Sequence, residues 1–180
     1  HPEEIQLDGQ KRHMTVVFTD LAGFTTISER LQEKTVDILN QYFSLMVPVI
    51  TGNTGFVNKF LGDGIMFFYG APIVNPDHAI HAVTTTLQMH DVLPAFNLEL
   101  EAKGLPPVKM RAGISTGSMI VGDAGGADRS DYTVLGDSVN LGSRLEGTNK
   151  EYETRIIISE WTRAAVKDGI VTRRLGAVRV

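Results

Sequence analysis

Two aspartates stand at the ends of apolar runs, where a side chain can leave a protein core. Asp20 directly follows the apolar and β-branched run 14–19, and Asp63 lies in a Gly-Asp-Gly turn between two further apolar runs. Taken singly, each is more often structural, because Asp forms turns and caps through its own local hydrogen bonds. If the runs are neighbouring strands, however, both carboxylates emerge at one edge of a sheet, where two oxygen ligands can hold Mg²⁺ together with substrate phosphates. The pair therefore predicts metal-dependent phosphate chemistry.

A phosphate site is predicted beside the first aspartate. The segment 21–25, which includes Phe24 and Thr25, places backbone N–H groups at an expected helix start, where unpaired donors and the helix dipole favour an anion. Farther along the chain, Asn140 and Arg144 lie four residues apart and so share one face of an expected helix. Such a pair usually marks a solvated surface, but beside a phosphate site it could hold a ribose and a transferring phosphoryl group.

Apolar periodicity predicts a mixed fold that would position these side chains. In chain order, we expect a strand over 14–19, a long helix over 26–50, a hairpin over 56–69, a helix over 75–103, strands over 107–115 and 118–122, an exposed loop over 122–130, a helix over 137–149, a strand over 154–158, a helix over 159–167 and two edge strands over 170–180. Thr26 and Glu29 have the spacing of a capping box, and Pro94 is expected to kink or split its helix. This order indicates an α+β fold with a split βαβ core, an antiparallel sheet covered by helices on one face, and a C-terminal α/β extension.

Composition narrows the classes of protein that remain. The chain has 180 residues, 42% of them hydrophobic and 21% charged, which is typical of one globular domain. Its formal net charge of −4 argues against nucleic acid as a partner. The absence of cysteine excludes disulfides, thiolate ligands and a cysteine nucleophile, and the sequence has no P-loop motif. No window reaches the roughly 18 apolar residues of a membrane span, so we expect a cytoplasmic domain, whose full-length protein could be membrane-tethered.

Three separated motifs carry a family resemblance. They are Phe-Thr-Asp-Leu-Ala-Gly-Phe-Thr at 18–25, Lys-Phe-Leu-Gly-Asp-Gly at 59–64, and the stretch 131–146 that begins Asp-Tyr-Thr-Val-Leu-Gly-Asp. In this order they closely resemble the catalytic domain of class III nucleotidyl cyclases, over almost the whole chain from about Lys11. The resemblance implies a ferredoxin-like palm core and a head-to-tail homodimer with two active sites at its interface. It also implies attack of the ribose 3′-oxygen on the α-phosphate, which releases pyrophosphate and a cyclic nucleotide.

The resemblance assigns roles to individual residues. It implies that Asp20 and Asp63, with the Leu21 carbonyl, hold two Mg²⁺ or Mn²⁺ ions. Asn140 matches the residue that orients the ribose, and Arg144 matches the one that stabilises charge on the α-phosphate in the transition state. The family also has a basic residue for the triphosphate near the C-terminus. Arg179 is a weak substitute for it, and we expect the family residue beyond Val180.

Lys59 and Thr133 match the pair that reads the purine base. A lysine donor suits N1 of adenine, which is an acceptor, whereas a glutamate would accept from the N1–H of guanine. Lys59 therefore favours ATP as the substrate and adenylate cyclase as the activity. Guanylate cyclase is the alternative, and outside this motif an exposed lysine on a strand would need no function. A non-catalytic, cyclase-like nucleotide-binding module is a further alternative, although such domains usually lose one of the metal aspartates or the Asn and Arg pair.

The domain organisation follows from the extent of the resemblance. We expect residues 1–180 to form a single catalytic domain, with residues 1–12 as a lead-in. Because the chain begins with His1 and not with methionine, we also expect it to be part of a longer protein with an upstream regulatory domain. The sequence does not indicate what that domain would sense.

Overall fold

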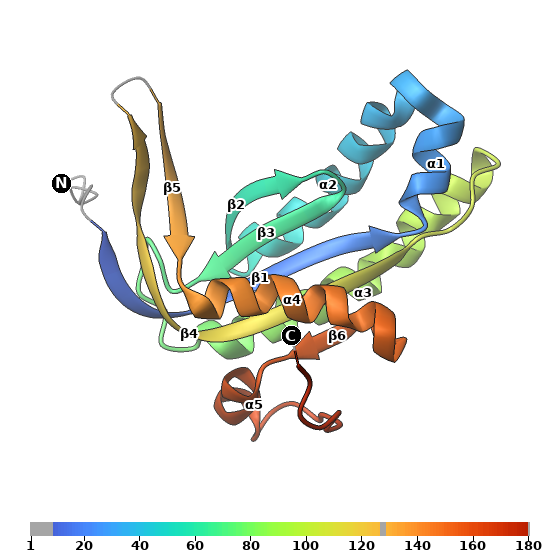
Figure 1. Cartoon of the computed structure of the whole chain (residues 1–180). Helices are drawn as coiled ribbons and strands as arrows, with labels where there is room; N and C mark the ends of the chain where they lie inside the picture. Colours follow the sequence, from blue (N-terminus) through green and yellow to red (C-terminus); the bar gives the residue numbers. More distant parts are fainter. Residues whose placement is uncertain (1–8, 127–128, 180) are drawn as a thin grey trace.

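A computed structural model describes residues 9–126 and 129–179 (Figure 1). The elements in chain order are β1 (Gln10–Ala22), α1 (Phe24–Leu31), the 3₁₀ turn η1 (Gln32–Lys34), α2 (Thr35–Gly52), β2 (Phe56–Leu61), β3 (Gly64–Tyr69), α3 (His78–Ala102), β4 (Lys109–Gly126), β5 (Arg129–Leu135), α4 (Asp137–Tyr152), β6 (Ile156–Ile158) and α5 (Glu160–Val166). Within the described ranges, no helix combines the length and the apolar character that crossing a bilayer would require.

The strands form one sheet in the order β2-β3-β1-β4-β5, with β6 added to β4. All pairs are antiparallel except β4 with β6. The β1–β4 ladder runs without a break from the Gln10–Val121 pair to the Ala22–Lys109 pair. Two crossovers complete the core: α1 and α2 connect β1 to β2, and α3 connects β3 to β4. This is the predicted split βαβ core, so the α+β fold class is confirmed.

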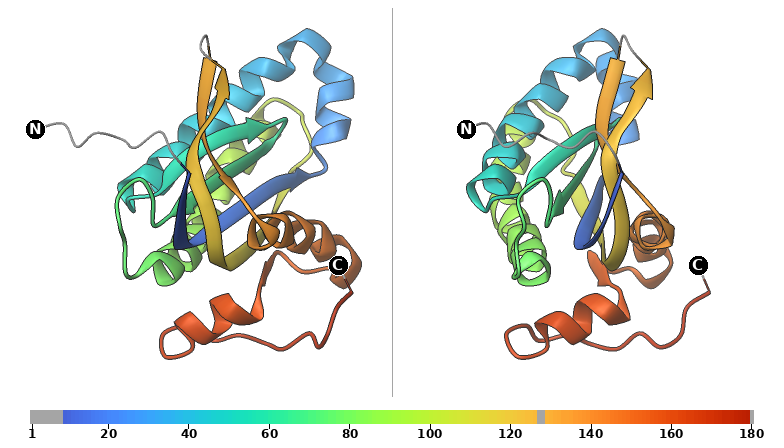
Figure 2. Two further views of the ribbon diagram at one scale, coloured as in Figure 1. Left: turned by 60° about the vertical axis from the view of Figure 1, so that its left-hand side comes forward. Right: turned by 90° about the vertical axis from the view of Figure 1, so that its left-hand side faces the viewer.

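Helices cover both faces of the sheet, whereas the sequence analysis expected one. The first face packs on α2 and α3 in the larger core, where Val17 and Phe67 of the sheet meet Met46 and Phe96 of the helices. On the second face, α4 packs against β1 and β4 (Figure 2). Residues along a strand point alternately to its two sides, so Phe18 and Asp20 share this second face.

Two glycines let α4 lie very close to the sheet. A side chain on Gly113 of β4 would collide with the backbone of α4 at Gly142 and Glu146. In turn, a Cβ on Gly142 would press on Val16 and Phe18 of β1 at 3.1–3.3 Å. Close packing of this kind tolerates little movement. The position of α4 over Val16 and Phe18 of β1 and Gly113 of β4 is therefore well determined.

Several predicted helix boundaries were wrong. The first helix begins at Phe24 after Gly23, whose φ of 92° suits glycine, and not at the predicted capping box of Thr26 and Glu29. The expected long helix is divided into α1 and α2 by η1, where Gln32 has a φ of 49°. The next helix begins at His78, because the Asn75 side chain accepts from the N–H of Asp77 in a separate turn. This helix, α3, runs through Pro94 without being split.

Three predictions about strands and loops were also wrong. The strands expected over 107–115 and 118–122 are one strand, β4, because Thr116 and Gly117 pair with β1 like their neighbours. The expected glycine-rich loop is mostly an arm of β4 and β5, paired as far as Gly126 and Arg129, although residues 127–128 lie outside the described part of the chain. Residues 170–179 form no strand, since nothing in the described chain pairs with them.

A chain of buried hydroxyl groups crosses the first face of the sheet. Nδ1 of His78 lies 2.7 Å from Oγ1 of Thr15, which lies 2.8 Å from Oγ1 of Thr116. Thr116 continues the chain to Thr162 at 2.8 Å. The ring of His78 also contacts that of His13, with centroids 5.2 Å apart. His78 is thus half-buried between a hydroxyl chain and a second imidazole.

We expect His78 to make folding sensitive to mild acid. Burial lowers the pKa of His78, and His13 lowers it further, while Asp77 opposes the shift. Since the folded pKa lies below the unfolded value of about 6.5, the contribution of His78 to stability is complete above that pH and is lost as the pH falls below it. Thermal unfolding at about pH 7.5 and pH 5.5 should show a smaller loss of Tm for a His78→Gln variant than for the unsubstituted chain. An equal loss in both proteins would contradict this prediction.

Candidate functional site

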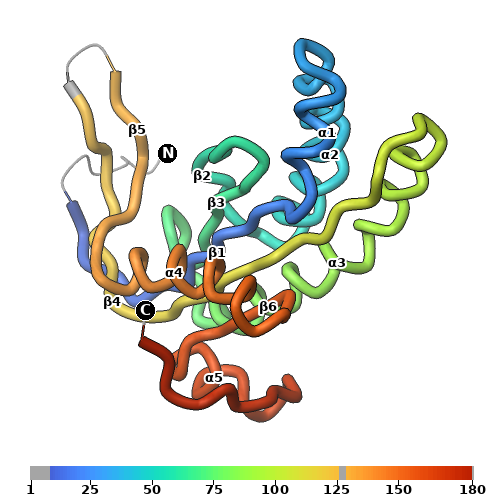
Figure 3. The backbone as a smooth tube through the Cα atoms, turned by 45° about the vertical axis from the view of Figure 1, so that its right-hand side comes forward, coloured from blue at the N-terminus to red at the C-terminus, as the bar shows by residue number. Residues whose placement is uncertain are grey.

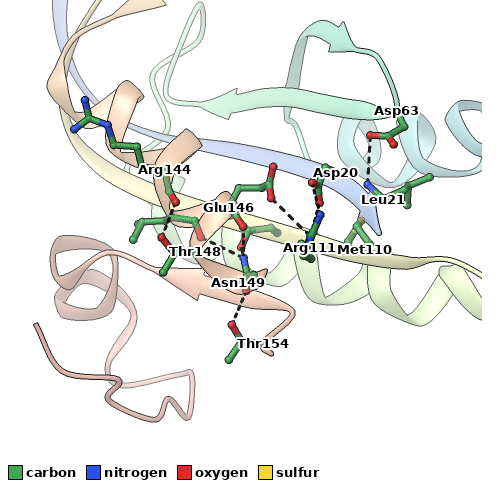
Figure 4. A network of polar contacts seen from close by, with 12 residues as sticks. Asp20, Leu21, Asp63, Met110, Arg111, Arg144, Glu146, Thr148, Asn149 and Thr154 are labelled. Atoms are coloured by element: carbon green, nitrogen blue, oxygen red, sulfur yellow. Dashed lines mark hydrogen bonds and ion pairs between the residues drawn. The ribbon is translucent and has the colours of Figure 1, made fainter. Parts of the chain in front are cut away.

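The β2–β3 hairpin brings Asp63 to the end of β1, where Asp20 lies (Figure 4). The backbone N–H of Leu21 donates to Oδ1 of Asp63 at 3.4 Å. Two residues farther along the chain, in β3, the N–H of Ile65 donates to the hydroxyl of Thr19 at 3.1 Å. Only glycine fits between these two bonds, because a side chain at position 64 would collide with the Thr19 carbonyl. The predicted convergence of two carboxylates at one sheet edge is therefore present in the structure.

The electrostatics of this edge suit a divalent cation. Burial raises the pKa of Asp63, and the charge of Asp20 raises it further, against the hydrogen bond from Leu21 and the charge of Arg111. Two carboxylates that repel each other and offer only oxygen ligands are the donor set that Mg²⁺ prefers. Within residues 9–126 and 129–179, no group of three or more His, Asp or Glu side chains could hold a metal ion. Backbone, water or substrate oxygens would complete the coordination of an ion here.

An arginine and a glutamate that the sequence analysis did not select lie beside Asp20. Arg111 of β4 donates to both carboxylate oxygens of Asp20, from Nε at 2.9 Å and from Nη2 at 2.8 Å. Oε2 of Glu146 lies 4.0 Å from the same Nε. Burial raises the pKa of Glu146 to about 7, with the charge of Asp20 as the second cause. The site thus holds three carboxylates and one guanidinium.

One signal in the sequence could have revealed Arg111. It alternates with apolar residues in the strand pattern at 108–114, so its side chain had to leave the core on the side opposite to theirs. The sequence did not indicate the register between β1 and β4, and only their pairing in the structure shows that Arg111 lies opposite Asp20. Glu146 gave no comparable signal, since an acidic residue near a helix end is usually solvated.

The predicted phosphate site lies at the start of α1. Gly23 is the N-cap, and no side chain caps the helix. The N–H groups of the first turn, which includes Phe24 and Thr25, are therefore not used by a capping side chain. Phe24 is buried and anchors the turn, whereas Thr25 is exposed. This turn directly follows the carboxylate edge of the sheet, as the sequence analysis expected.

Lys59 and Thr133, the predicted base-reading pair, lie on the two outer strands, β2 and β5. The two strands contact each other through the residues next to this pair, because Nδ2 of Asn58 in β2 donates to the carbonyl of Tyr132 in β5. The ring of Tyr132 also contacts that of Phe56, with centroids 5.5 Å apart. Tyr132 of β5 thus contacts β2, while the end of the β4–β5 arm projects away from the sheet (Figures 1 and 3).

Asn58 owes its position to a bulge in β2. The register with β3 shifts between Val57 and Lys59, which leaves Asn58 as the extra residue. Lys59 pairs with Met66, whose side chain belongs to the core of the second face. Since directly opposed residues share a face, the exposed Lys59 lies on the same side of the sheet as Asp20.

Asn140 and Arg144 lie on α4 and are both exposed. The guanidinium of Arg144 points away from Asp20 and Asp63 in Figure 4. Its backbone carbonyl accepts from the hydroxyl of Thr148 at 2.8 Å, so only the side chain is free to reach a ligand. A single chain therefore does not bring Arg144 together with the two aspartates.

Comparisons with known proteins identify the family of the chain. The sequence profile of the adenylate and guanylate cyclase catalytic domain matches residues 8–180. The chain is 40% identical over 170 residues to adenylate cyclase 1 of Rhizobium meliloti, covering 94% of this chain and 26% of that protein. It is 36% identical over 154 residues to an adenylate cyclase of Anabaena cylindrica, covering 83% and 30%. The chain thus spans little more than a quarter of the length of these relatives.

Solved structures show the same fold. The adenylyl cyclase CyaB from P. aeruginosa superposes with a TM-score of 0.89 at 35% identity, covering 97% of this chain and 90% of that one. The guanylyl cyclase Cya2 superposes with a TM-score of 0.80 at 40% identity, covering 87% and 79%. Relatives with either name therefore resemble this chain about equally well in sequence.

Proposed function

Because the chain belongs to the family of adenylate and guanylate cyclase catalytic domains, we propose that it converts ATP to 3′,5′-cyclic AMP and pyrophosphate at two sites in a homodimer. One observation carries the proposal. The backbone N–H of Leu21 bonds to Asp63, so the carboxylates of Asp20 and Asp63 both lie at the end of β1, beside the start of α1. That arrangement suits a triphosphate with its metal ions. The domain itself, residues 1–180, would be the catalytic part of a larger protein with a regulatory domain.

In this proposal the site residues form two groups, a first group that holds the metal ions and the phosphates and a second group, Asn140 and Arg144, that acts on the ribose and the α-phosphate. Asp20, Asp63 and the Leu21 carbonyl would hold two Mg²⁺ or Mn²⁺ ions, with the first turn of α1 on the phosphates. When bound, such ions supply a lowered pKa of the ribose 3′-hydroxyl and neutralise charge on the triphosphate. Asn140 would orient the ribose, and Arg144 would stabilise the charge that develops on the α-phosphate.

The second group would serve a site on the partner. Asn140 is exposed on α4, and Arg144 points away from the aspartates of its own chain (Figure 4). In a head-to-tail pair with two-fold symmetry, the α4 of each copy would meet the aspartates of the other, which generates two equal sites. Neither copy would be active alone, so specific activity should fall on dilution as the pair dissociates.

Lys59 and Thr133 support ATP over GTP as the substrate. A lysine ammonium can only donate hydrogen bonds, and N1 of adenine accepts them, whereas N1 of guanine carries a proton. Thr133, with a hydroxyl that donates or accepts, can adapt to the neighbouring edge of the base. The Asn58 contact to Tyr132 would keep the two residues on one base.

Turnover of the two nucleotides tests the proposal directly. With Mn²⁺ or Mg²⁺ present, we expect cyclic AMP from ATP and much less cyclic GMP from GTP. A Lys59→Glu variant should lower the ratio of kcat/KM for ATP to that for GTP about 5- to 150-fold, which corresponds to about 1–3 kcal/mol, because the new acceptor would face an acceptor on adenine.

Lys167→Glu is the matched control, since it makes the same charge change at an exposed lysine just after α5. It should leave the nucleotide ratio unchanged. Full selectivity for ATP in Lys59→Glu would mean that the base is read elsewhere. Turnover of GTP alone by the unsubstituted chain would identify a guanylate cyclase, and no turnover of either would favour a non-catalytic nucleotide-binding module.

A further inference from the structure

Arg111 occupies the whole carboxylate of Asp20. Its Nε atom donates to Oδ1 at 2.9 Å and its Nη2 atom donates to Oδ2 at 2.8 Å. The contact is set by register, because the two residues are directly opposed in the β1–β4 ladder. Both side chains are mostly shielded from water, with 21% of Arg111 and 27% of Asp20 exposed. A divalent cation that used the same oxygens would have to compete with this guanidinium, since both bind them through charge.

Glu146 offers Arg111 a second partner close by. Its Oε2 atom lies 4.0 Å from Nε of Arg111, beyond hydrogen-bond distance. The atom is buried and accepts no hydrogen bond from any described residue. A buried carboxylate oxygen without a donor is unfavourable. Because the glycine contacts of α4 hold the backbone at Glu146 close to Gly113, this unsatisfied acceptor stays beside Arg111.

We propose that Arg111 is a positioning residue that exchanges partners when a divalent cation binds. Without the cation it closes on Asp20, and with the cation bound it moves to Glu146. The exchange frees the carboxylate, and it keeps the guanidinium paired next to the added positive charge. This inference rests on the proposed function only in that it assigns a cation to Asp20.

The exchange makes two predictions of opposite sign for cation affinity. Arg111→Gln removes the competitor, so the chain without nucleotide should bind Mn²⁺ more tightly, on the order of tenfold. Glu146→Gln removes the second partner, so Mn²⁺ should bind more weakly by a similar factor. Arg111→Lys should lie between Arg111→Gln and the unsubstituted chain, because an ammonium cannot bond both oxygens in a fork.

A double-variant cycle separates the exchange from a simple charge effect. Loss of the Glu146 charge alone would weaken Mn²⁺ binding whether or not Arg111 is present. If Glu146 acts by receiving Arg111, its substitution should have little effect once Arg111 is already Gln. The measurement is the electron paramagnetic resonance signal of free Mn²⁺ in a titration of each protein. Circular dichroism melts check that each variant is folded, and Arg155→Gln serves as the exposed arginine control.

Three results would overturn the inference. They are unchanged or weaker binding by both Arg111 variants, an undiminished effect of Glu146→Gln in the Arg111→Gln background, and no Mn²⁺ binding by any of the proteins. Turnover of ATP by the same unsubstituted sample reports separately on the proposed function. A chain that makes cyclic AMP but fails the cycle refutes only the exchange, and an inactive chain that passes it refutes only the cyclase proposal.

Discussion

An Asp63→Asn variant is expected to lose on the order of 10²- to 10³-fold in turnover of ATP while its thermal stability stays equal or rises. Activity falls because an amide is a much weaker cation ligand than a carboxylate. Stability behaves differently, because burial and the charge of Asp20 raise the pKa of Asp63, so the fold disfavours its ionised form at neutral pH. The amide removes that charge, and its oxygen can still accept from the N–H of Leu21. Assays with saturating Mn²⁺ and thermal melts measure the two effects.

The comparison with Asp20 sharpens this prediction. Asp20→Ala should lose activity by a similar factor, but it should also lower the Tm, because it takes away both hydrogen-bond acceptors of Arg111. Asp91→Asn, at an exposed position on α3, is the matched control and should change neither quantity. Turnover that survives in either site variant would remove the metal assignment.

Heterodimers of two inactive variants should recover activity. In the proposed dimer, Asp20 of one copy works with Asn140 of the other. A purified heterodimer of Asp20→Ala with Asn140→Ala therefore contains one intact site and should have about half of the activity of the unsubstituted dimer. Copies with different affinity tags allow that heterodimer to be isolated and assayed.

The reciprocal heterodimer gives the opposite result. A chain with both substitutions, paired with an unsubstituted chain, damages one site through Asp20 and the other through Asn140, so it should be inactive. If instead each site were built within one chain, the two outcomes would be reversed: the first heterodimer would be dead and the second half-active. The pair of measurements thus decides between a shared site and a single-chain site.

Local patterns predicted the elements of this fold well and their contacts poorly. The Gly-Asp-Gly turn indicated the hairpin correctly, because its glycines suit a tight turn and the flanking runs suit strands. The start of α1 was missed because Gly23 takes the cap position without a side-chain bond, whereas the capping-box spacing of Thr26 and Glu29, which lie inside the helix, was a misleading signal. The β4–β5 arm was read as a loop because glycine weakens strand propensity, whereas backbone pairing overrides it.

The residues of the candidate site also differ in how far the sequence could predict them. Asp20 and Asp63 could be selected from their positions after apolar runs, and the hairpin places them together. The alternation at 108–114 marks Arg111 only as a side chain that leaves the core, and Glu146 has no such signal. Their place in the site depends on strand register and on how closely α4 approaches the sheet. Asn58 shows the same limit, because its contact to Tyr132 joins strands at opposite ends of the sheet order.

The glycine contacts beneath α4 also bear on how such a protein can be controlled. With Gly113 and Gly142 closed against their neighbours, α4 has no room to slide over the sheet, and β1 is bonded to β4 along its whole length. The aspartate edge and the exposed face of α4 are thus mounted on one rigid body. In the proposed two-fold pair, a regulator that left each copy unchanged would have to act by rotating one copy against the other. Such a rotation would open or close both proposed sites in concert.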